Sequence, residues 1–342
     1  MIIDKPQAAA VVERIPGREW LNIVQNYRGA DFGRSVWEIV VTAGPFVAFW
    51  IAAWMALSVS YWLTLLLALP AGVFLVRLFL IQHDCGHGAF FNKRTTNDWV
   101  GRVLGVLTLT PYDVWKRSHA IHHAHSGDLD HRGIGDIDTL TVSEYKALSP
   151  LRRFYYRLYR HPLVMFGVGP AYVFLLQQRL PFGQMHDGWR PWVSAMGTNF
   201  GIAALFLVMV YLVGAGPFLM VHLPVVLLGA SIGVWLFYIQ HQFEDTYWAQ
   251  GEEWSQHDAA LYGSSYYELP KPLSWLTANI GIHHVHHLYA RIPFYKLPNV
   301  LRDHPELADV QRVTLLESFK YVRLKLWDEK RKQLVGFSDV KV

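Results

Sequence analysis

Four apolar stretches, each close to the length that crosses a lipid bilayer, set the architecture of this chain. A transmembrane helix needs about 20 consecutive apolar residues. The stretches come in two pairs, and each pair is joined by three uncharged residues, at 58–60 and 214–216. Connections this short allow only tight antiparallel hairpins. We therefore predict four transmembrane helices in two hairpins, over residues 36–57, 61–82, 195–213 and 217–240.

The composition agrees with a membrane protein. Apolar residues make up 52% of the chain and charged residues 17%, against about 25% charged in soluble domains. The net charge of +4 is small and the basic residues form no stripe with aromatic residues, so we expect no nucleic-acid partner. The lone Cys85 can form no intramolecular disulfide, and no cleavable leader opens the sequence. We expect an uncleaved cytoplasmic N-terminus.

The basic residues orient the hairpins. Of the 31 Lys and Arg residues, five precede the first span, 13 lie between the hairpins and 12 follow the last span. The remaining one, Arg77, is near the cytoplasmic end of the second span, where we expect its side chain to reach the interface. Neither hairpin turn carries a basic residue, and cytoplasmic flanks carry the excess of positive charge. The chain is thus predicted as one all-α domain, 1–342, with a cytoplasmic helical cap over 83–194 and 241–342.

Shorter segments outside the spans suggest helices at the membrane surface. Helical spacing near the start predicts either a surface helix or one packed on the protein, through Trp20, Leu21, Val24 and Tyr27. The apolar stretches 103–109 and 163–176 are too short to span, so we expect interfacial or re-entrant packing.

A C-terminal helix is also expected. Thr314 and Glu317 have the spacing of a capping box. A helical stripe would then run through Leu315, Phe319, Val322 and Leu326. Two positions stay open for this helix, the membrane surface and the cytoplasmic cap.

A run of four histidines in five residues, HHVHH at 283–287, predicts a metal site. On a helix, His283 can converge with His286 or His287, because residues three and four apart share a face. The adjacent His286 and His287 point about 100° apart and would serve two metal centres better than one. Neutral imidazole suits zinc, copper, iron and nickel, so the run does not identify the metal.

Partners for this run lie at other cytoplasmic positions. HDCGH at 83–87 follows the second span, HAIHH at 119–123 repeats the three-and-four spacing, and His241 follows the fourth span. Four or five imidazoles for each of two metals is the economical interpretation. The predicted ligands are His83, His87, His119, His122, His123, His241, His283, His286 and His287.

The remaining polar residues near these boxes are given supporting roles. Carboxylates commonly accept the free ring N–H of a ligating histidine, and our candidates are Asp84, Asp136 and Glu244, with Asp128, Asp138 and Asp245 in the same stretches. We expect surface or supporting roles for the other eight histidines, His125, His131, His161, His186, His222, His257, His284 and His304.

The three boxes around two membrane hairpins resemble the integral-membrane fatty acid desaturase family. Two motifs are similar to those of the acyl-lipid branch, which includes the omega-6 (delta-12) enzymes. They are HDCGHGAF at 83–90 and RIPFY at 291–295, after the third box. The resemblance covers most of the chain and identifies the superfamily better than the substrate. This sequence differs by an extra imidazole inside the third box, His284, which we expect not to bind metal.

The resemblance implies a catalytic di-iron centre held by the nine histidines. In that family two Fe ions, cycling between Fe2+ and Fe3+, use O2 to introduce a cis double bond into a fatty acyl chain, here expected on acyl lipids. Two electrons are needed, and the chain has no dinucleotide fingerprint, haem attachment motif or cysteine set for an iron–sulfur cluster. We expect an external donor, a ferredoxin or a small haem cytochrome, docking on the basic cytoplasmic face.

Other functions share these boxes. A carotenoid ketolase or hydroxylase, a fatty acyl hydroxylase or an alkane hydroxylase would use the same iron site. A membrane metal transporter is disfavoured, because its ligands would lie near mid-membrane, whereas these histidines lie at span ends and in loops. We expect a multi-pass protein of a bacterial inner membrane, with termini and active site in the cytoplasm.

Overall fold

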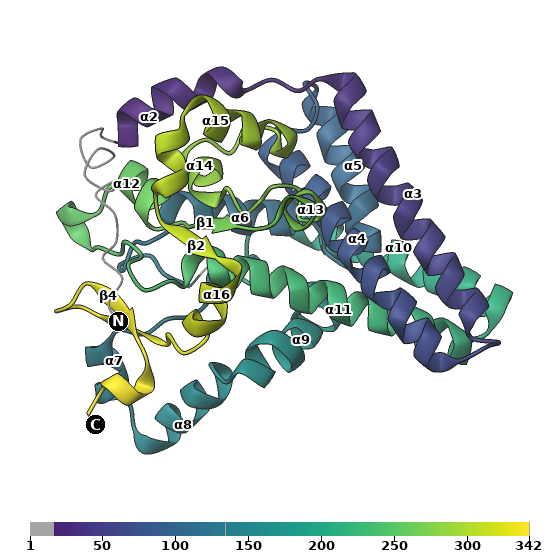
Figure 1. Ribbon diagram of the computed structural model, residues 1–342. Helices are drawn as coiled ribbons and strands as arrows, with labels where there is room; N and C mark the ends of the chain where they lie inside the picture. The colour runs from purple at the N-terminus through teal and green to yellow at the C-terminus, as the bar shows by residue number, and fades with distance from the viewer. Residues whose placement is uncertain (1–16, 134, 342) are drawn as a thin grey trace.

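The computed structural model describes residues 17–133 and 135–341 (Figure 1). The first 16 residues, on which the prediction of an uncleaved cytoplasmic start partly rests, lie outside the described residues.

Four long apolar helices confirm the predicted spans. They are long and apolar enough to cross a membrane, and they form two hairpins whose turns lie at the same end of the molecule, on the right in Figure 1. Their bounds are α3 (Phe32–Ala56), α4 (Tyr61–His87), α10 (Trp189–Val213) and α11 (Ala215–His241). Both α4 and α10 continue beyond the apolar windows into the cap, so α4 carries the whole first histidine box.

Helix α4 lies at the centre of the bundle, between α3 and α11. Glycines permit a close approach of α4 and α11: a Cβ on Gly72 would lie 3.0 Å from the Leu228 Cβ, and one on Gly229 would lie 3.4 Å from the Gly72 carbonyl oxygen. Small residues at such crossings let two helix backbones pack tightly within a membrane. The histidines at the ends of α4 and α11 are thereby held at a fixed spacing.

Arg77 does not reach the interface, which corrects our expectation. Its side chain is fully buried and pairs with Glu38 of α3, itself 1% exposed. The guanidinium also donates to the Thr42 hydroxyl at 3.0 Å and to the Trp275 carbonyl, and lies over the Trp275 ring at 4.2 Å. The sequence offered no sign that a carboxylate 39 residues earlier faces the same point.

The cap before the second hairpin is built from short helices. Helix α2 (Gly17–Val24) and η1 (Gln25–Tyr27) precede α3. Between the hairpins lie α5 (Arg94–Leu107), α6 (Tyr112–His125), α7 (Val142–Ala147), α8 (Pro150–Tyr159), the π-helical turn η2 (Val164–Val168), α9 (Gly169–Leu175) and η3 (Gln177–Arg179).

The cap after the second hairpin adds two small sheets. Its helices are η4 (Gly251–Glu253), α12 (Gln256–Tyr262), α13 (Lys271–Leu276), α14 (His283–Leu288), η5 (Phe294–Lys296), α15 (Leu297–Asp303), η6 (Pro305–Asp309), α16 (Leu315–Tyr321) and η7 (Phe337–Asp339). Strand β1 (Tyr266–Glu268) pairs in parallel with β2 (Arg312–Thr314), with Tyr267 opposite Val313. Strand β3 (Leu326–Asp328) pairs antiparallel with β4 (Gln333–Val335).

Of the two helices predicted near the ends of the chain, one packs on the protein and the other is shorter than expected. Trp20 and Val24 of α2 are buried in the main core, so of the two interpretations packing on the protein holds for them. The capping box of Thr314 and Glu317 is confirmed, but α16 ends at Tyr321. The predicted helical stripe is wrong at Leu326, because that residue pairs with Val335 in the β3–β4 ribbon.

Removing the Glu38 carboxylate should destabilise the bundle. In Glu38→Gln the buried Arg77 guanidinium loses its anion, which costs about 3–5 kcal/mol for a buried pair. We expect a lower midpoint of thermal unfolding for the purified protein in detergent. The matched control is Asp113→Asn, which breaks an exposed pair with Arg102 (2.9 Å) and should cost less than about 1 kcal/mol. Equal midpoints for the two variants would contradict a structural role for the buried pair.

Candidate metal centre

The first box lies on the last turn of α4. His83 and His87 are four residues apart and share one face of this helix, with ring centroids 4.7 Å from each other. Gly88 then ends the helix in the left-handed conformation at φ +66. The box is thus part of the membrane-spanning helix rather than of the loop after it.

The second box lies on α6 and divides between two directions. His119 and His123 are one turn apart on the helix, and their Nε2 atoms are 3.1 Å apart. His122 points elsewhere, and its Nε2 lies 3.1 Å from the Nε2 of His241, the last residue of α11. His241, which belongs to none of the three boxes, therefore lies beside a box histidine.

The third box forms the short buried helix α14. The Ser265 carbonyl just before β1 accepts from the backbone N–H of His283 at 3.2 Å and fixes the start of the helix. His283 lies 3.0 Å from His241, between Nε2 atoms, whereas His286 lies 3.2 Å from His123. The predicted divergence of His286 and His287 is found, and His283 converges with His287 rather than with both.

The nine histidines form two groups, in each of which the candidate ligand nitrogens lie within 4.8 Å of one another. The first group is His83, His87, His119, His123 and His286. The second group is His122, His241, His283 and His287. Two imidazole nitrogens bound to one ion at about 2.1 Å, at right angles, are about 3.0 Å apart. The separations of 3.0 to 3.2 Å given above fit this geometry.

Burial keeps the cap histidines in the form that binds metal. It holds the pKa of each of His119, His123, His283, His286 and His287 well below its usual range, and neighbouring histidines lower these pKa values further. Neutral imidazole is the ligating form. Both ring nitrogens of His287 are buried without a hydrogen-bond partner, as expected of a ring that needs a further ligand.

Two of the three candidate carboxylates contact box histidines. Asp136 hydrogen-bonds to Nδ1 of His122, and Asp84 lies 3.3 Å from Nδ1 of His83. Asp84 also accepts from the backbone N–H of Phe294 at 2.7 Å. A carboxylate on Nδ1 leaves Nε2 free for a metal and fixes the ring orientation.

The supporting role of the third candidate carboxylate, Glu244, stays a prediction. Helix α11 ends at His241, so Glu244 lies in the loop beyond it, where its backbone carbonyl accepts from Leu334. Within the described residues Glu244 contacts no histidine of either group.

His284 belongs to neither group, in line with the prediction. Its Nε2 is 2.9 Å from the carbonyl oxygen of Leu307 in η6. Burial lowers the pKa of this ring to about 4. The extra imidazole therefore fastens the third box to the cap.

The sequence did not reveal a third group of potential metal ligands. His125 and His131, assigned only surface or supporting roles, lie together with Asp128 near the molecular surface. The available signal was their regular spacing of three residues, 125, 128 and 131.

A large cavity runs from the bundle to both histidine groups. Its volume is about 1030 Å³, at the upper end of the roughly 300–1,000 Å³ typical of ligand pockets. His83 and His119 of the first group and His283 of the second are among the residues that line it. The remaining wall is largely apolar, and α4, α6, η2, α9 and α11 contribute to it, with residues that include Leu75, Phe79, Trp115, Val164, Val168, Tyr172, Val226 and Val234.

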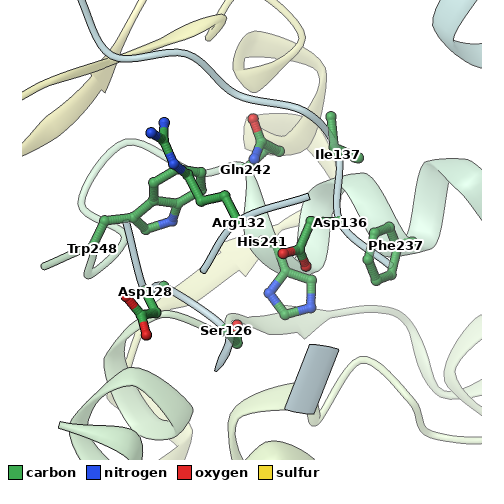
Figure 2. Close-up of a pocket in the computed structure, with 10 residues that line it drawn as sticks. Ser126, Asp128, Arg132, Asp136, Ile137, Phe237, His241, Gln242 and Trp248 are labelled. Atoms are coloured by element: carbon green, nitrogen blue, oxygen red, sulfur yellow. The ribbon is translucent and has the colours of Figure 1, made fainter. Parts of the chain in front are cut away.

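A much smaller cavity, of about 20 Å³, reaches the second group from the other side (Figure 2). Asp128 and Trp248 lie on one side of it and Asp136, His241 and Phe237 on the other. This volume holds about one water molecule.

Comparison with known proteins agrees with this geometry. The sequence model of the family described as "Fatty acid desaturase" matches residues 60–318. A Bacillus subtilis protein named "Fatty acid desaturase" is 47% identical over 307 residues, covering 90% of this chain and 87% of the relative. A Synechocystis "sn-1 acyl-lipid omega-3 desaturase (ferredoxin)" is 29% identical over 64% of this chain and 61% of its own length. An Anabaena variabilis "sn-1 oleoyl-lipid 12-desaturase" is 24% identical over 80% of this chain and 75% of its own length.

Loss of one ring from either group should lower the metal content. His119→Ala, His123→Ala or His286→Ala removes a ligand of the first group, and His241→Ala removes a ligand of the second. We expect each variant to lose at least one of two metal ions per chain, measured by elemental analysis of the purified protein.

The matched control is His161→Ala, because His161 is exposed on the cap. We expect the His161→Ala variant to keep both metal ions. Two ions retained in His241→Ala would mean that the second group has three protein ligands, and retention in the first three variants would refute the first group.

Proposed function

The chain belongs to the fatty acid desaturase family, and from this premise we propose that it introduces a cis double bond into acyl chains of membrane lipids. The net reaction takes one O2, two electrons and two protons, and converts a CH2–CH2 unit into CH=CH with release of two waters. The two histidine groups are the proposed site of this reaction.

One observation carries the proposal: a single apolar cavity is lined by rings of both histidine groups. His83 and His283, one from each group, lie on the same cavity wall. The middle carbons of a saturated acyl chain carry no polar group, so the chain must be bound by shape and apolar contact. A large, mostly apolar cavity lined by histidines of both groups meets this need.

We assign one iron to the five histidines of the first group and one to the four of the second. Bound there, the iron pair would supply the activation of O2 that removal of hydrogen from an unactivated methylene requires. Iron suits an all-imidazole ligand set.

The protein's own residues orient the rings and exclude water. Asp84 and Asp136 fix the Nδ1 side of His83 and His122, so that each Nε2 faces its group. Trp115 stacks on His119 at 4.6 Å and meets Phe79 edge-on at 5.3 Å. These two aromatic rings line the cavity beside the first group and would press a bound chain against it.

The route of the acyl chain from the membrane is proposed to pass beside α9. Leu163 and Leu176 expose large apolar surfaces, while Val164 and Val173 of the same segment line the cavity. A segment that is apolar on both sides fits an interfacial position with lipid outside and substrate inside.

Helix α8 supports an anionic membrane surface as the neighbour. It exposes Leu151, Phe154 and Leu158 along with Arg152 and Arg157. Basic and apolar residues on one exposed helix bind anionic lipid surfaces. The lipid head group would then stay at this surface while its chain enters the cavity.

The electron donor is proposed to be a ferredoxin. Two relatives carry ferredoxin in their names, the Synechocystis protein and an Arabidopsis thaliana "sn-2 acyl-lipid omega-3 desaturase (ferredoxin), chloroplastic", 29% identical over 72% of this chain and 53% of its own length. The cap carries most of the Lys and Arg residues, which favours an acidic protein partner.

The cap, the histidines and both flanks of the hairpins are proposed to face the cytoplasm of a bacterium, in its inner membrane. The uncharged hairpin turns and basic cap support this orientation. A common core that includes Trp20, Leu75, Tyr238 and Val300 supports a single domain.

Expression in a host of defined lipid content tests the activity. We expect new monounsaturated or polyunsaturated acyl chains, with double bonds located by mass spectrometry after chemical derivatisation. They should disappear in His123→Ala and persist in His161→Ala. A hydroxylated or keto product without a new alkene would instead identify one of the related oxygenases.

The cavity itself can be tested by filling it. A Cβ on Gly233 of α11 would meet no atom within 4 Å, and this residue lines the cavity. Gly233→Leu should therefore reduce conversion of long acyl chains more than of short ones, in the same fatty acid analysis. Gly197→Leu on α10 adds the same bulk at an open position outside the cavity lining and should leave the product profile unchanged. Equal profiles for both variants would place the substrate elsewhere.

A further inference from the structure

Two histidines and one aspartate outside the nine form a third group of potential metal ligands. The ligand atoms of His125, Asp128 and His131 lie within 4.8 Å of one another. Asp128 Oδ2 is 2.8 Å from Nδ1 of His131 and 3.6 Å from Nδ1 of His125. Two imidazoles and one carboxylate are a ligand set that binds Fe2+ and related divalent ions.

The backbone holds these three residues in place. His125 is the last residue of α6, and Gly127 follows in the left-handed conformation at φ +72. The turn is then fastened to the segment around Ala249, whose backbone accepts from the N–H of Leu129 at 2.9 Å and donates to the Gly127 carbonyl at 3.0 Å. The turn that carries Asp128, directly after His125, is therefore fixed before any ion binds.

The rings of the group are oriented as well as placed. Trp254 stacks on His125 at 6.3 Å and donates its indole N–H to the Ser126 carbonyl at 3.2 Å. The second carboxylate oxygen of Asp128 accepts from the backbone N–H of Asp130 at 2.9 Å. Such orienting contacts raise the affinity of a metal site.

The group is open to solvent on one side and adjoins the second histidine group on the other. The side chain of His131 is 63% exposed, whereas Asp128 is buried. Asp128 also borders the small cavity whose opposite wall includes His241 and the Asp136 that holds His122 (Figure 2).

The nearest basic side chain does not oppose a cation here. Arg132 also lines the small cavity, but both of its terminal nitrogens bond to Glu144, at 3.0 and 2.6 Å. Its charge is thereby balanced by a carboxylate outside the group.

We infer that His125, Asp128 and His131 form a third divalent-cation site, which holds Fe2+ at the surface for loading into the second histidine group. Its cation-binding role stands on the geometry of the three ligands alone. Its loading role rests on the proposed function, since it requires iron in the second group. A site of three ligands with open positions binds an ion reversibly, and the neighbouring group of four imidazoles can then bind it more tightly.

Equilibrium dialysis of the iron-loaded, tag-free protein against Zn2+ tests the site. Iron and zinc are counted together by elemental analysis, so any displacement of iron is visible. The wild type should bind one zinc more than His131→Ala or His125→Ala at the same free Zn2+. His186→Ala, which removes another exposed histidine, should bind as much as the wild type. Equal zinc in the wild type and both site variants would refute the site.

Expression in iron-limited and iron-rich media tests the loading role. We expect His131→Ala to carry several-fold less iron than the wild type when iron is limiting, and the same amount when iron is abundant. If His131→Ala and the wild type carry equal iron in both media, loading through this site is refuted, even if the site binds zinc. A wild type without iron in the nine histidines would refute the proposed function instead, and the zinc comparison would still decide the third site.

Discussion

Nine imidazoles in mutual contact, six of them buried and three partly buried, determine what the rest of this molecule must hold in place. His123 and His287, from different groups, stack with ring centroids 4.0 Å apart, and both nitrogens of His287 have no hydrogen-bond partner. Each buried polar atom left unpaired costs about 1–3 kcal/mol. Contacts elsewhere must hold the rings together until metal binding supplies the missing partners. The tight crossing of α4 and α11, and the Arg77–Glu38 pair that joins α3, α4 and α13, provide this rigidity.

Much of this arrangement could be predicted because it follows from periodicity and length. Apolar windows located the spans, and the three-and-four spacing of the boxes located their shared faces. Periodicity does not say where a helix stops. Leu326 fitted a helical stripe and lies in a strand, and Glu244 lay three residues from His241 but beyond the end of its helix.

Contacts between distant segments were the least predictable. Glu38 and Arg77 are each unusual in an apolar helix, yet only the three-dimensional packing shows that they face each other. The cavity is likewise absent from any single stretch, because its walls come from elements far apart in the sequence, α4, α6, α9 and α11 among them. The same holds for the turn after α6, where the group at Asp128 depends on the segment around Ala249.

The two helices α6 and α14 share one pattern of division. In both boxes the first and last histidines, one full turn apart, serve one group, and the histidine before the last serves the other. No carboxylate belongs to either group among the described residues. The spacing of the two histidine groups is therefore set by the rise and twist of an α-helix. Two metal ions held this way would move apart or together only if a whole helix rotated, so their spacing is as stiff as the peptide backbone itself.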